Sequence, residues 1–227
     1  MRPTGPAEPR PAHKETDQVL GVNTGQTGKT RCVVGLGNPG RRYARTRHNV
    51  GFQVVEALAA RWKADGPREA FGGSVYDARP AAPRGGREVE RIVLLRPLTF
   101  MNCSGQAVGK LARYFKVENE NILIVLDDIA LPPGQLRLRA GGSAGGHKGL
   151  ADVVAALDGE DVPRLRIGIG EAPAGMDAAD HVLGRFEKSR EPAIAQAVTL
   201  AAQAAEAWVF EDIAAAMSQY NQRPADR

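Results

Sequence analysis

The 227 residues suffice for one domain with a sizeable core, and the composition is that of an ordinary soluble protein. A net charge of +4 weakly favours an anionic partner. Whether the protein binds one must be judged from where the basic residues lie. Two cysteines and four histidines, without an HExxH pair, exclude a disulfide framework and disfavour a zinc site. No apolar run reaches the roughly 18 residues of a membrane span. These features predict a cytoplasmic protein.

The first 30 residues differ from the rest, because prolines crowd them and no apolar periodicity appears. They predict a disordered extension, without the apolar core of a signal peptide and with acidic residues that disfavour a mitochondrial transit sequence. The triplet Gly28-Lys29-Thr30 imitates the end of a P-loop, but Asn23 stands where that motif needs glycine. We therefore expect the folded domain to span residues 31–222, followed by a short tail at 223–227.

From residue 32 onward, short apolar strands alternate with segments of helical periodicity. The pattern predicts strands at residues 32–36, 91–96, 122–126, 135–139 and 164–170. It predicts helices at residues 50–62, 102–115, 193–209 and 213–220, and one more after the glycines that end near residue 149. The Gly-, Pro- and Arg-rich residues 66–89 predict an exposed loop or hairpin. The fold class is a single α/β domain with a twisted, mixed and mostly parallel sheet flanked by helices.

A glycine-rich turn follows the first predicted strand and leads to a single histidine. The turn contains Asn38, which can donate and accept hydrogen bonds, and His48 follows just before a helix begins. A neutral imidazole can take a proton near pH 7, so this pair suits acid–base chemistry on a polar substrate. Gly35, Gly37 and Gly40 also fit the spacing of a dinucleotide-binding loop, but no acidic residue ends a following strand about 20 residues on.

Two further polar clusters follow predicted strands. Asn102 and Ser104 stand at the junction of a strand and a helix, where each serves either as a helix cap or as part of a functional site. Asp127 and Asp128 end the strand at residues 122–126, where α/β folds place ligand-binding groups. One aspartate could orient and polarise a histidine, while the other caps the turn.

A fourth cluster combines a glycine-rich loop with arginines. Residues 141–150 hold five glycines around a serine, a histidine and a lysine, and such a loop at a helix start exposes backbone N–H groups to an anion. Arg137 and Arg139 alternate with leucines, so both guanidinium groups share one face of the sheet. Arg164 and Arg166 repeat the arrangement. We interpret these arginine pairs as phosphate contacts, with a mobile linker and surface charge as the alternative.

Taken together, these motifs resemble the bacterial-type peptidyl-tRNA hydrolases. The resemblance covers residues 30–220 and rests on GLGNPG, YARTRHNVGF, LTFMNCSG, LDDIALPPG, GGSAGGHKGL and RLRIGIG, in this order. It implies hydrolysis of the ester that joins a peptide, or an N-blocked amino acid, to the 3′ end of tRNA. It also implies a monomer that needs no cofactor or metal and meets the acceptor stem of tRNA.

The resemblance also implies roles for individual residues. His48 would be the catalytic base, Asp127 the carboxylate that raises its basicity, and Asn38 a catalytic residue beside the scissile ester. Asn102 would hold the substrate near the ester, and Tyr43, Phe100 and Met101 would shape its pocket. From the loop and strand patterns themselves, we expect five more residues to bind the substrate or its tRNA: Arg137, Arg139, His147, Lys148 and Arg166. No serine or cysteine stands in a nucleophile elbow, which favours direct attack by water.

Three positions depart from the family's pattern. Lys148 replaces a common asparagine, Leu126 a histidine found in some members, and Ala130 an acidic residue. A different class of function remains open, since a few relatives are RNA-binding splicing factors without hydrolase activity. An unrelated esterase or nucleotide-binding enzyme is a further alternative.

Overall fold

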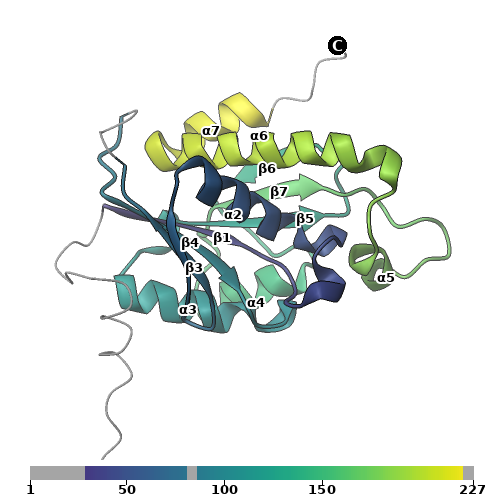
Figure 1. The fold of residues 1–227 in the computed structure, drawn as a ribbon, viewed down its shortest axis with the longest axis horizontal. Helices are drawn as coiled ribbons and strands as arrows, with labels where there is room; N and C mark the ends of the chain where they lie inside the picture. The colour runs from purple at the N-terminus through teal and green to yellow at the C-terminus, as the bar shows by residue number, and fades with distance from the viewer. Residues whose placement is uncertain (1–28, 81–85, 222–227) are drawn as a thin grey trace, which may run out of the picture.

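The computed structural model describes residues 29–80 and 86–221. The predicted C-terminal tail and nearly all of the predicted N-terminal extension lie outside these ranges. The described residues form a seven-stranded sheet with helices on both faces (Figure 1). Its strands are β1 (Thr30–Gly35), β2 (Asp65–Ala70), β3 (Gly73–Ala78), β4 (Arg91–Pro97), β5 (Ile122–Asp128), β6 (Leu136–Arg139) and β7 (Arg164–Gly168).

The helices are α2 (Val50–Arg61), α3 (Ser104–Phe115), α4 (Lys148–Ala156), α5 (Ala178–Leu183), α6 (Glu191–Phe210) and α7 (Ile213–Tyr220). Short 3-10 turns are η1 (Arg41–Tyr43), η2 (Arg47–Asn49), η3 (Met101–Cys103), η4 (Asn119–Asn121) and η5 (Lys188–Arg190). The predicted strands and helices are confirmed, with ends that shift by at most a few residues.

The strand order is β2-β3-β4-β1-β5-β7-β6. The four strands β4, β1, β5 and β7 run parallel, and the remaining strands join antiparallel at the two sides. The predicted mixed, mostly parallel sheet is therefore confirmed. Because the carboxyl ends of the parallel strands meet at one edge, the polar residues that end β5 and those that follow β1 and β4 come together there.

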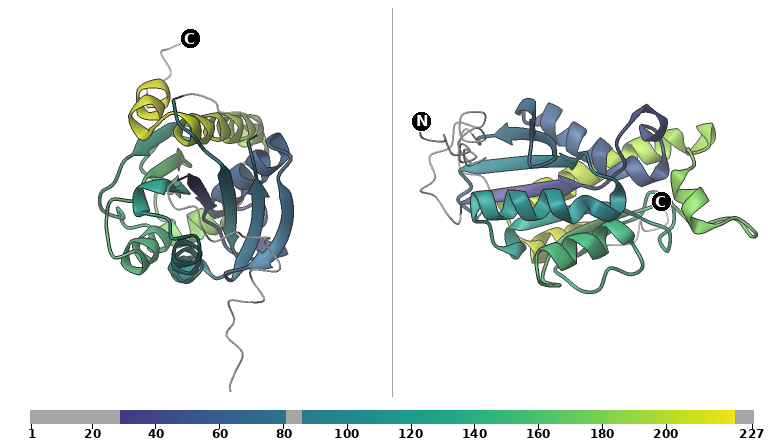
Figure 2. Two further views of the ribbon diagram at one scale, coloured as in Figure 1. Left: turned by 90° about the vertical axis from the view of Figure 1, so that its left-hand side faces the viewer. Right: turned by 90° about the horizontal axis from the view of Figure 1, so that it is seen from below.

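Two apolar cores flank the sheet. Helices α2, α6 and α7 cover one face, and α3 and α4 cover the other (Figure 2). The first turn of α2 packs directly against β1. The approach is so close that a side chain at Gly35 would clash with the carbonyl oxygen of Gly51. Only glycine permits this approach, which places the residues before α2 at the carboxyl edge.

The part of residues 66–89 that the structure describes is predicted from the sequence to be an exposed loop or hairpin. These residues include most of the β2–β3 hairpin, and the predicted hairpin is thus confirmed. The predicted exposure is wrong for β3, because it pairs with β4 and is mostly buried. The short α5 has no counterpart among the predicted helices.

The start of α3 lacks the cap that the sequence predicts. The Ser104 hydroxyl donates to the Met101 carbonyl, and no side chain within the segment caps the helix. Instead, the Asp152 carboxylate on α4 accepts the Gly105 N–H at 2.6 Å. A negative charge at a helix N-terminus is favourable, so α4 supplies the missing cap across the helix pair.

Among the described residues, one helical stretch, Lys188–Phe210, is long and apolar enough to cross a bilayer. It packs against α2, α7 and the sheet, and Ala201, Ala204 and Trp208 are fully or almost fully buried. Its apolar character is explained by its place in the core.

Candidate active site at the carboxyl edge of the sheet

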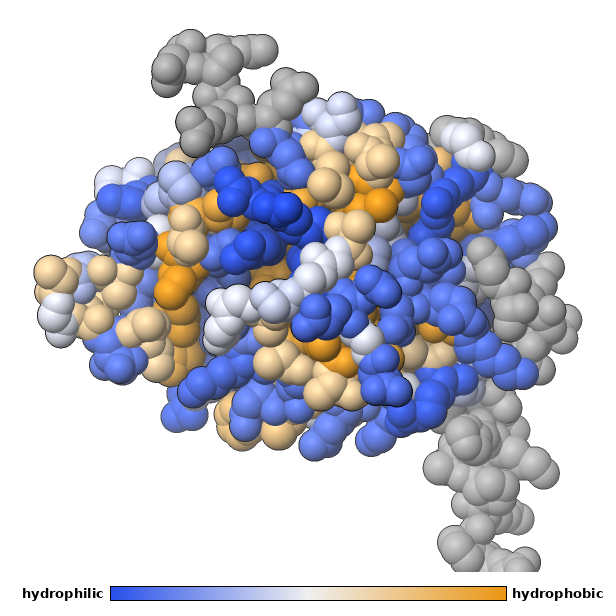
Figure 3. Space-filling model, turned by 180° about the vertical axis from the view of Figure 1, so that it is seen from behind, coloured by the Kyte–Doolittle hydropathy of each residue, from blue (hydrophilic) through white to orange (hydrophobic). Residues whose placement is uncertain are grey.

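A cavity of about 550 Å³ opens at the carboxyl ends of β1, β4 and β5. It is lined by all the predicted catalytic residues, and by all the predicted binding residues except Arg137 and Arg139. Its mouth is apolar, since Phe100, Ile129 and Leu183 line it with more than a third of their surface exposed. In the view from behind, one strip of apolar surface lies near the end of the molecule that carries α5, and further apolar patches lie elsewhere on the same face (Figure 3).

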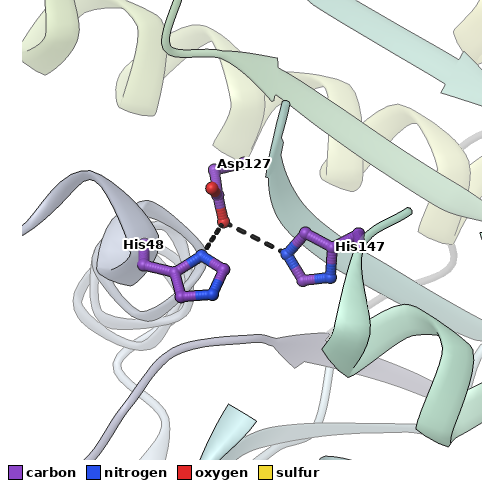
Figure 4. A group of neighbouring side chains, drawn as sticks. All are labelled: His48, Asp127 and His147. Carbon is purple, nitrogen blue, oxygen red and sulfur yellow. Dashed lines mark hydrogen bonds and ion pairs between the residues drawn. The ribbon is translucent and has the colours of Figure 1, made fainter. Parts of the chain in front are cut away.

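Two histidines converge on one carboxylate in this cavity (Figure 4). His48 Nδ1 lies 2.7 Å from Asp127 Oδ1, and His147 Nε2 lies 3.3 Å from the same oxygen. The Asp127 side chain is almost fully buried, whereas the two imidazoles keep 13% and 11% of their surface exposed. The predicted pairing of a histidine with Asp127 is present, and His147 joins it as a second partner.

The ionisation of Asp127 is set by these neighbours. Burial by itself would raise the pKa of this carboxyl, but the hydrogen bonds from His147 and His48 outweigh it and hold the pKa well below its usual value. The stability that this group contributes is therefore present at neutral pH and is lost only in strong acid. At neutral pH, Asp127 is an anion that can only accept hydrogen bonds.

The anion fixes the proton on His48. Because a carboxylate only accepts, Nδ1 of His48 carries the hydrogen of the 2.7 Å bond. In the neutral ring, Nε2 is then free of a proton, and it points away from Asp127 (Figure 4). This is the tautomer that a general base on a water molecule needs.

Asn38 is held in one orientation by its surroundings. Its backbone N–H donates to Asn49 Oδ1 at 2.8 Å, and its carbonyl accepts from Asn49 Nδ2 at 2.9 Å. Its side-chain oxygen accepts the Met101 N–H at 2.9 Å. The side-chain oxygen is thus occupied, so the amide NH₂ is the group that Asn38 can offer to a ligand.

Asp128 takes the second role predicted for the two aspartates. Its Oδ1 accepts the Ala130 N–H at 2.9 Å and so closes the turn after β5. Its Oδ2 lies 2.7 Å from Arg166 Nη2, which places that guanidinium at the wall of the cavity.

The strand arginines have two different surroundings. Arg137 faces Arg166 across the β6–β7 pair, and Arg139 is exposed, as expected for phosphate contacts. Arg164 differs, because it is only 2% exposed and donates to carbonyl groups of Gly142, Ser143, Glu160 and Val162. The prediction that Arg164 contacts phosphate is wrong: it lies beneath the glycine-rich loop. Strand alternation identifies a shared face but not the loop that covers it.

The glycine-rich loop ends at α4 with a histidine cap. Gly145 and Gly146 have positive φ values, 56° and 81°, which other residues adopt only with strain. His147 follows as the N-cap, and its Nδ1 accepts the Leu150 N–H at 3.1 Å. Lys148 is exposed at the cavity wall, where the start of the helix offers its cation no favourable partner.

Sequence reasoning missed the wall that α5 forms. The α5 residues that line the cavity are Ala178, Ala179, Val182 and Leu183. Arg47 holds this helix beside the catalytic segment, donating from its side chain to the His181 carbonyl and from its backbone to Gly184. A helix of six residues, fewer than two turns, has too little periodicity to be recognised from the sequence.

His48, Asp127 and His147 have the residue types of a metal site, and their ligand atoms lie within 4.8 Å of one another. The hydrogen bond from Leu150 argues against this use. A metal on His147 Nε2 would need the proton on Nδ1, where the Leu150 N–H already donates. The arrangement fits proton transfer better than metal binding.

The fold and site define a single-domain α/β protein whose histidine–carboxylate pair opens into an apolar-mouthed cavity. Residues 32–227 match the family model described as peptidyl-tRNA hydrolase. A peptidyl-tRNA hydrolase of Syntrophomonas wolfei is 46% identical over 84% of this chain and all of its own length. One of Rhodopirellula baltica is 42% identical over 84% of this chain and 97% of its own.

The fold comparison agrees. The crystal structure of peptidyl-tRNA hydrolase from Acinetobacter baumannii superposes with a TM-score of 0.77 and 35% identity, covering 88% of this chain and 99% of its own. The chain therefore belongs to the peptidyl-tRNA hydrolase family.

Proposed function

We propose that this chain hydrolyses the ester between a peptide, or an N-blocked amino acid, and the 3′ end of tRNA, and so returns free tRNA to translation. The observation that carries the proposal is the His48–Asp127 pair, which leaves an unprotonated ring nitrogen in a substrate-sized cavity. Family membership supplies the substrate class. The proposed reaction runs in the cytoplasm, in a monomer without a metal.

In this mechanism, His48 Nε2 takes a proton from a water molecule as that water attacks the ester carbonyl. The amide NH₂ of Asn38 donates to the oxyanion that forms, and Asn102 lies at the same wall. The proton returns from His48 to the departing ribose oxygen. Tyr43, Phe100 and Met101 line the cavity, where the exposed Phe100 ring can stack on the terminal base.

The non-catalytic RNA-binding alternative is less favoured, because the residues needed for hydrolysis are present together. Turnover of an N-acetylaminoacyl-tRNA separates the two, since a binding protein would retain the RNA without releasing the acyl group. Hydrolysis of a simple ester at an equal rate without tRNA would instead support an unrelated esterase.

Replacing Arg137 and Arg139 together by glutamine should raise KM for tRNA substrates and leave a minimal aminoacyl-nucleoside substrate almost unaffected. The reason is that phosphate contacts bind the backbone of the acceptor stem and are remote from the ester. Each lost contact should flatten the slope of log K against log salt by about 0.7 to 0.9. Steady-state kinetics across a salt series measure both effects.

The matched control is Arg68→Gln with Arg79→Gln, which removes the same charge from the β2–β3 side, the opposite end of the sheet. It should leave KM and the salt slope nearly unchanged. Equal losses on tRNA and on the minimal substrate would show that Arg137 and Arg139 act structurally instead.

Lys148→Ala should lower kcat by at least about tenfold, the lower end for one lost oxyanion donor, whereas Lys148→Asn should keep substantial activity. Both variants should move the acidic limb of the pH profile to higher pH, because a nearby cation disfavours a proton on His48. Lys110→Ala, on the exposed side of α3, is the control. Full activity of Lys148→Ala with an unmoved limb would show that Lys148 serves only as surface charge.

A further inference from the structure

The ring of His147 is held by two hydrogen bonds of opposite sense. The Leu150 N–H points at Nδ1 at 3.1 Å, and Nε2 lies 3.3 Å from Asp127 Oδ1. A backbone N–H can only donate, so Nδ1 is the acceptor and the ring proton sits on Nε2. The first turn of α4 therefore fixes His147 as a hydrogen-bond donor to Asp127.

The same turn opposes any other arrangement of protons on this ring. A proton on Nδ1 would face the Leu150 N–H and break the cap of α4. A positive charge there would also lie at the positive end of the helix dipole. The geometry therefore holds His147 as a donor to Asp127, with its ring centroid 5.1 Å from that of His48.

Both histidines donate a hydrogen bond to the same oxygen of Asp127, Oδ1. The bond from His147 stabilises the negative charge on Oδ1, and less of that charge is left to stabilise a proton shared with His48. We propose that His147 is a positioning residue that limits the basicity of His48 through their shared bond to Asp127, and that the N-cap of α4 holds it in this role. The proposal rests on the proposed function, in which His48 is the base.

Other charged or titratable groups lie on the elements that contact η2 or line the cavity, but among the described residues none of them bonds to Asp127 Oδ1. Those groups are Asp128 on β5, Lys148 on α4, Arg166 on β7, Arg47 on η2, Tyr43 on η1, Asp180 and His181 on α5, and Glu56, ion-paired with Arg96, on α2. Substitutions at His147 leave all of them in place, so a change in the titration of His48 reports the shared bond.

Two substitutions separate the two hydrogen bonds of the His147 ring, the cap of α4 at Nδ1 and the bond to Asp127 at Nε2. His147→Asn places an acceptor near the position of Nδ1 and keeps the cap, but it cannot reach Asp127. His147→Gln places an NH₂ near the position of Nε2 and keeps the donor to Asp127, but it loses the cap. We expect His147→Asn to move the acidic limb of kcat/KM to higher pH by about half a unit or more. We expect His147→Gln to leave the limb near its original position while lowering the melting temperature.

The decisive measurement uses the free protein, so it does not depend on the reaction. The chain holds four histidines, and their ring nitrogens can be assigned by NMR with single variants. The proposal expects an unprotonated Nδ1 on His147 and a titration midpoint of His48 that rises in His147→Asn but not in His147→Gln. A proton on His147 Nδ1, or an unmoved His48 midpoint in His147→Asn, overturns it. Absence of turnover in the wild type would instead overturn the proposed function and leave this result readable.

Discussion

His48→Ala should lower kcat on N-acetylaminoacyl-tRNA by roughly 10²- to 10⁴-fold, the usual contribution of a general base. Nε2 of His48 is the unprotonated nitrogen that the Asp127 carboxylate leaves toward the cavity. Since this residue takes the proton in the transition state, affinity for tRNA should hardly change. Single-turnover rates together with a tRNA-binding titration measure the two quantities separately.

Asp127→Asn is the companion variant. An amide can still accept from an imidazole N–H, so the loss of activity should be smaller than in His48→Ala. The missing negative charge should move the acidic limb of the profile to lower pH, because an anion favours the protonated ring and a neutral amide does not. Near-normal turnover of His48→Ala would remove His48 from its role as the base.

Asn38→Asp should lower kcat by about 10²- to 10³-fold, the cost of losing one oxyanion donor. The replacement has the same shape and keeps an oxygen for the Met101 N–H, so the local fold should survive. It removes the NH₂ group and places a negative charge where another negative charge develops. Rates on the minimal and the full tRNA substrate should fall together, because the effect lies at the ester.

Asn38→Ala is the matched comparison, since it loses both the donor and the bond to Met101. If Asn38 acts as a donor, Asn38→Asp is at least as inactive as Asn38→Ala. If Asn38 only anchors the turn, Asn38→Asp is nearly as active as the wild type and Asn38→Ala is the damaged variant. The second outcome would contradict the proposed role.

The sheet, and the meeting of a histidine with an aspartate at its edge, could be predicted from the sequence for one physical reason, and the family resemblance identified this pair as His48 and Asp127. Parallel strands bring their carboxyl ends to one edge, so groups 79 positions apart in sequence become neighbours when one ends β5 and the other lies in the segment that connects β1 to α2. The same logic applies to Asn38 and Met101, although the direction of their hydrogen bond could not be read from the motifs.

The features that the sequence does not predict depend on contacts between distant segments. The alternation of arginine with leucine along β7 predicts a surface position for Arg164, because the pattern carries no information about the loop that covers this side chain. Ser104 has the right chemistry for a cap, yet Asp152 takes that place from another helix. The second partner of Asp127 was missed because His147 follows a glycine-rich loop, whose path is set by packing and not by periodicity.

The bond between Asp152 and the first turn of α3 couples the local unfolding of two helices. Fraying of α4 would remove the cap of α3. The backbones also touch at Gly105, where a side chain would clash with the Asp152 carbonyl oxygen, so the helices cannot separate gradually. We therefore expect the amide hydrogens of the two helices to exchange as one cooperative unit. Because His147 precedes α4 and Asn102 precedes α3, such an opening would disrupt both sides of the cavity together.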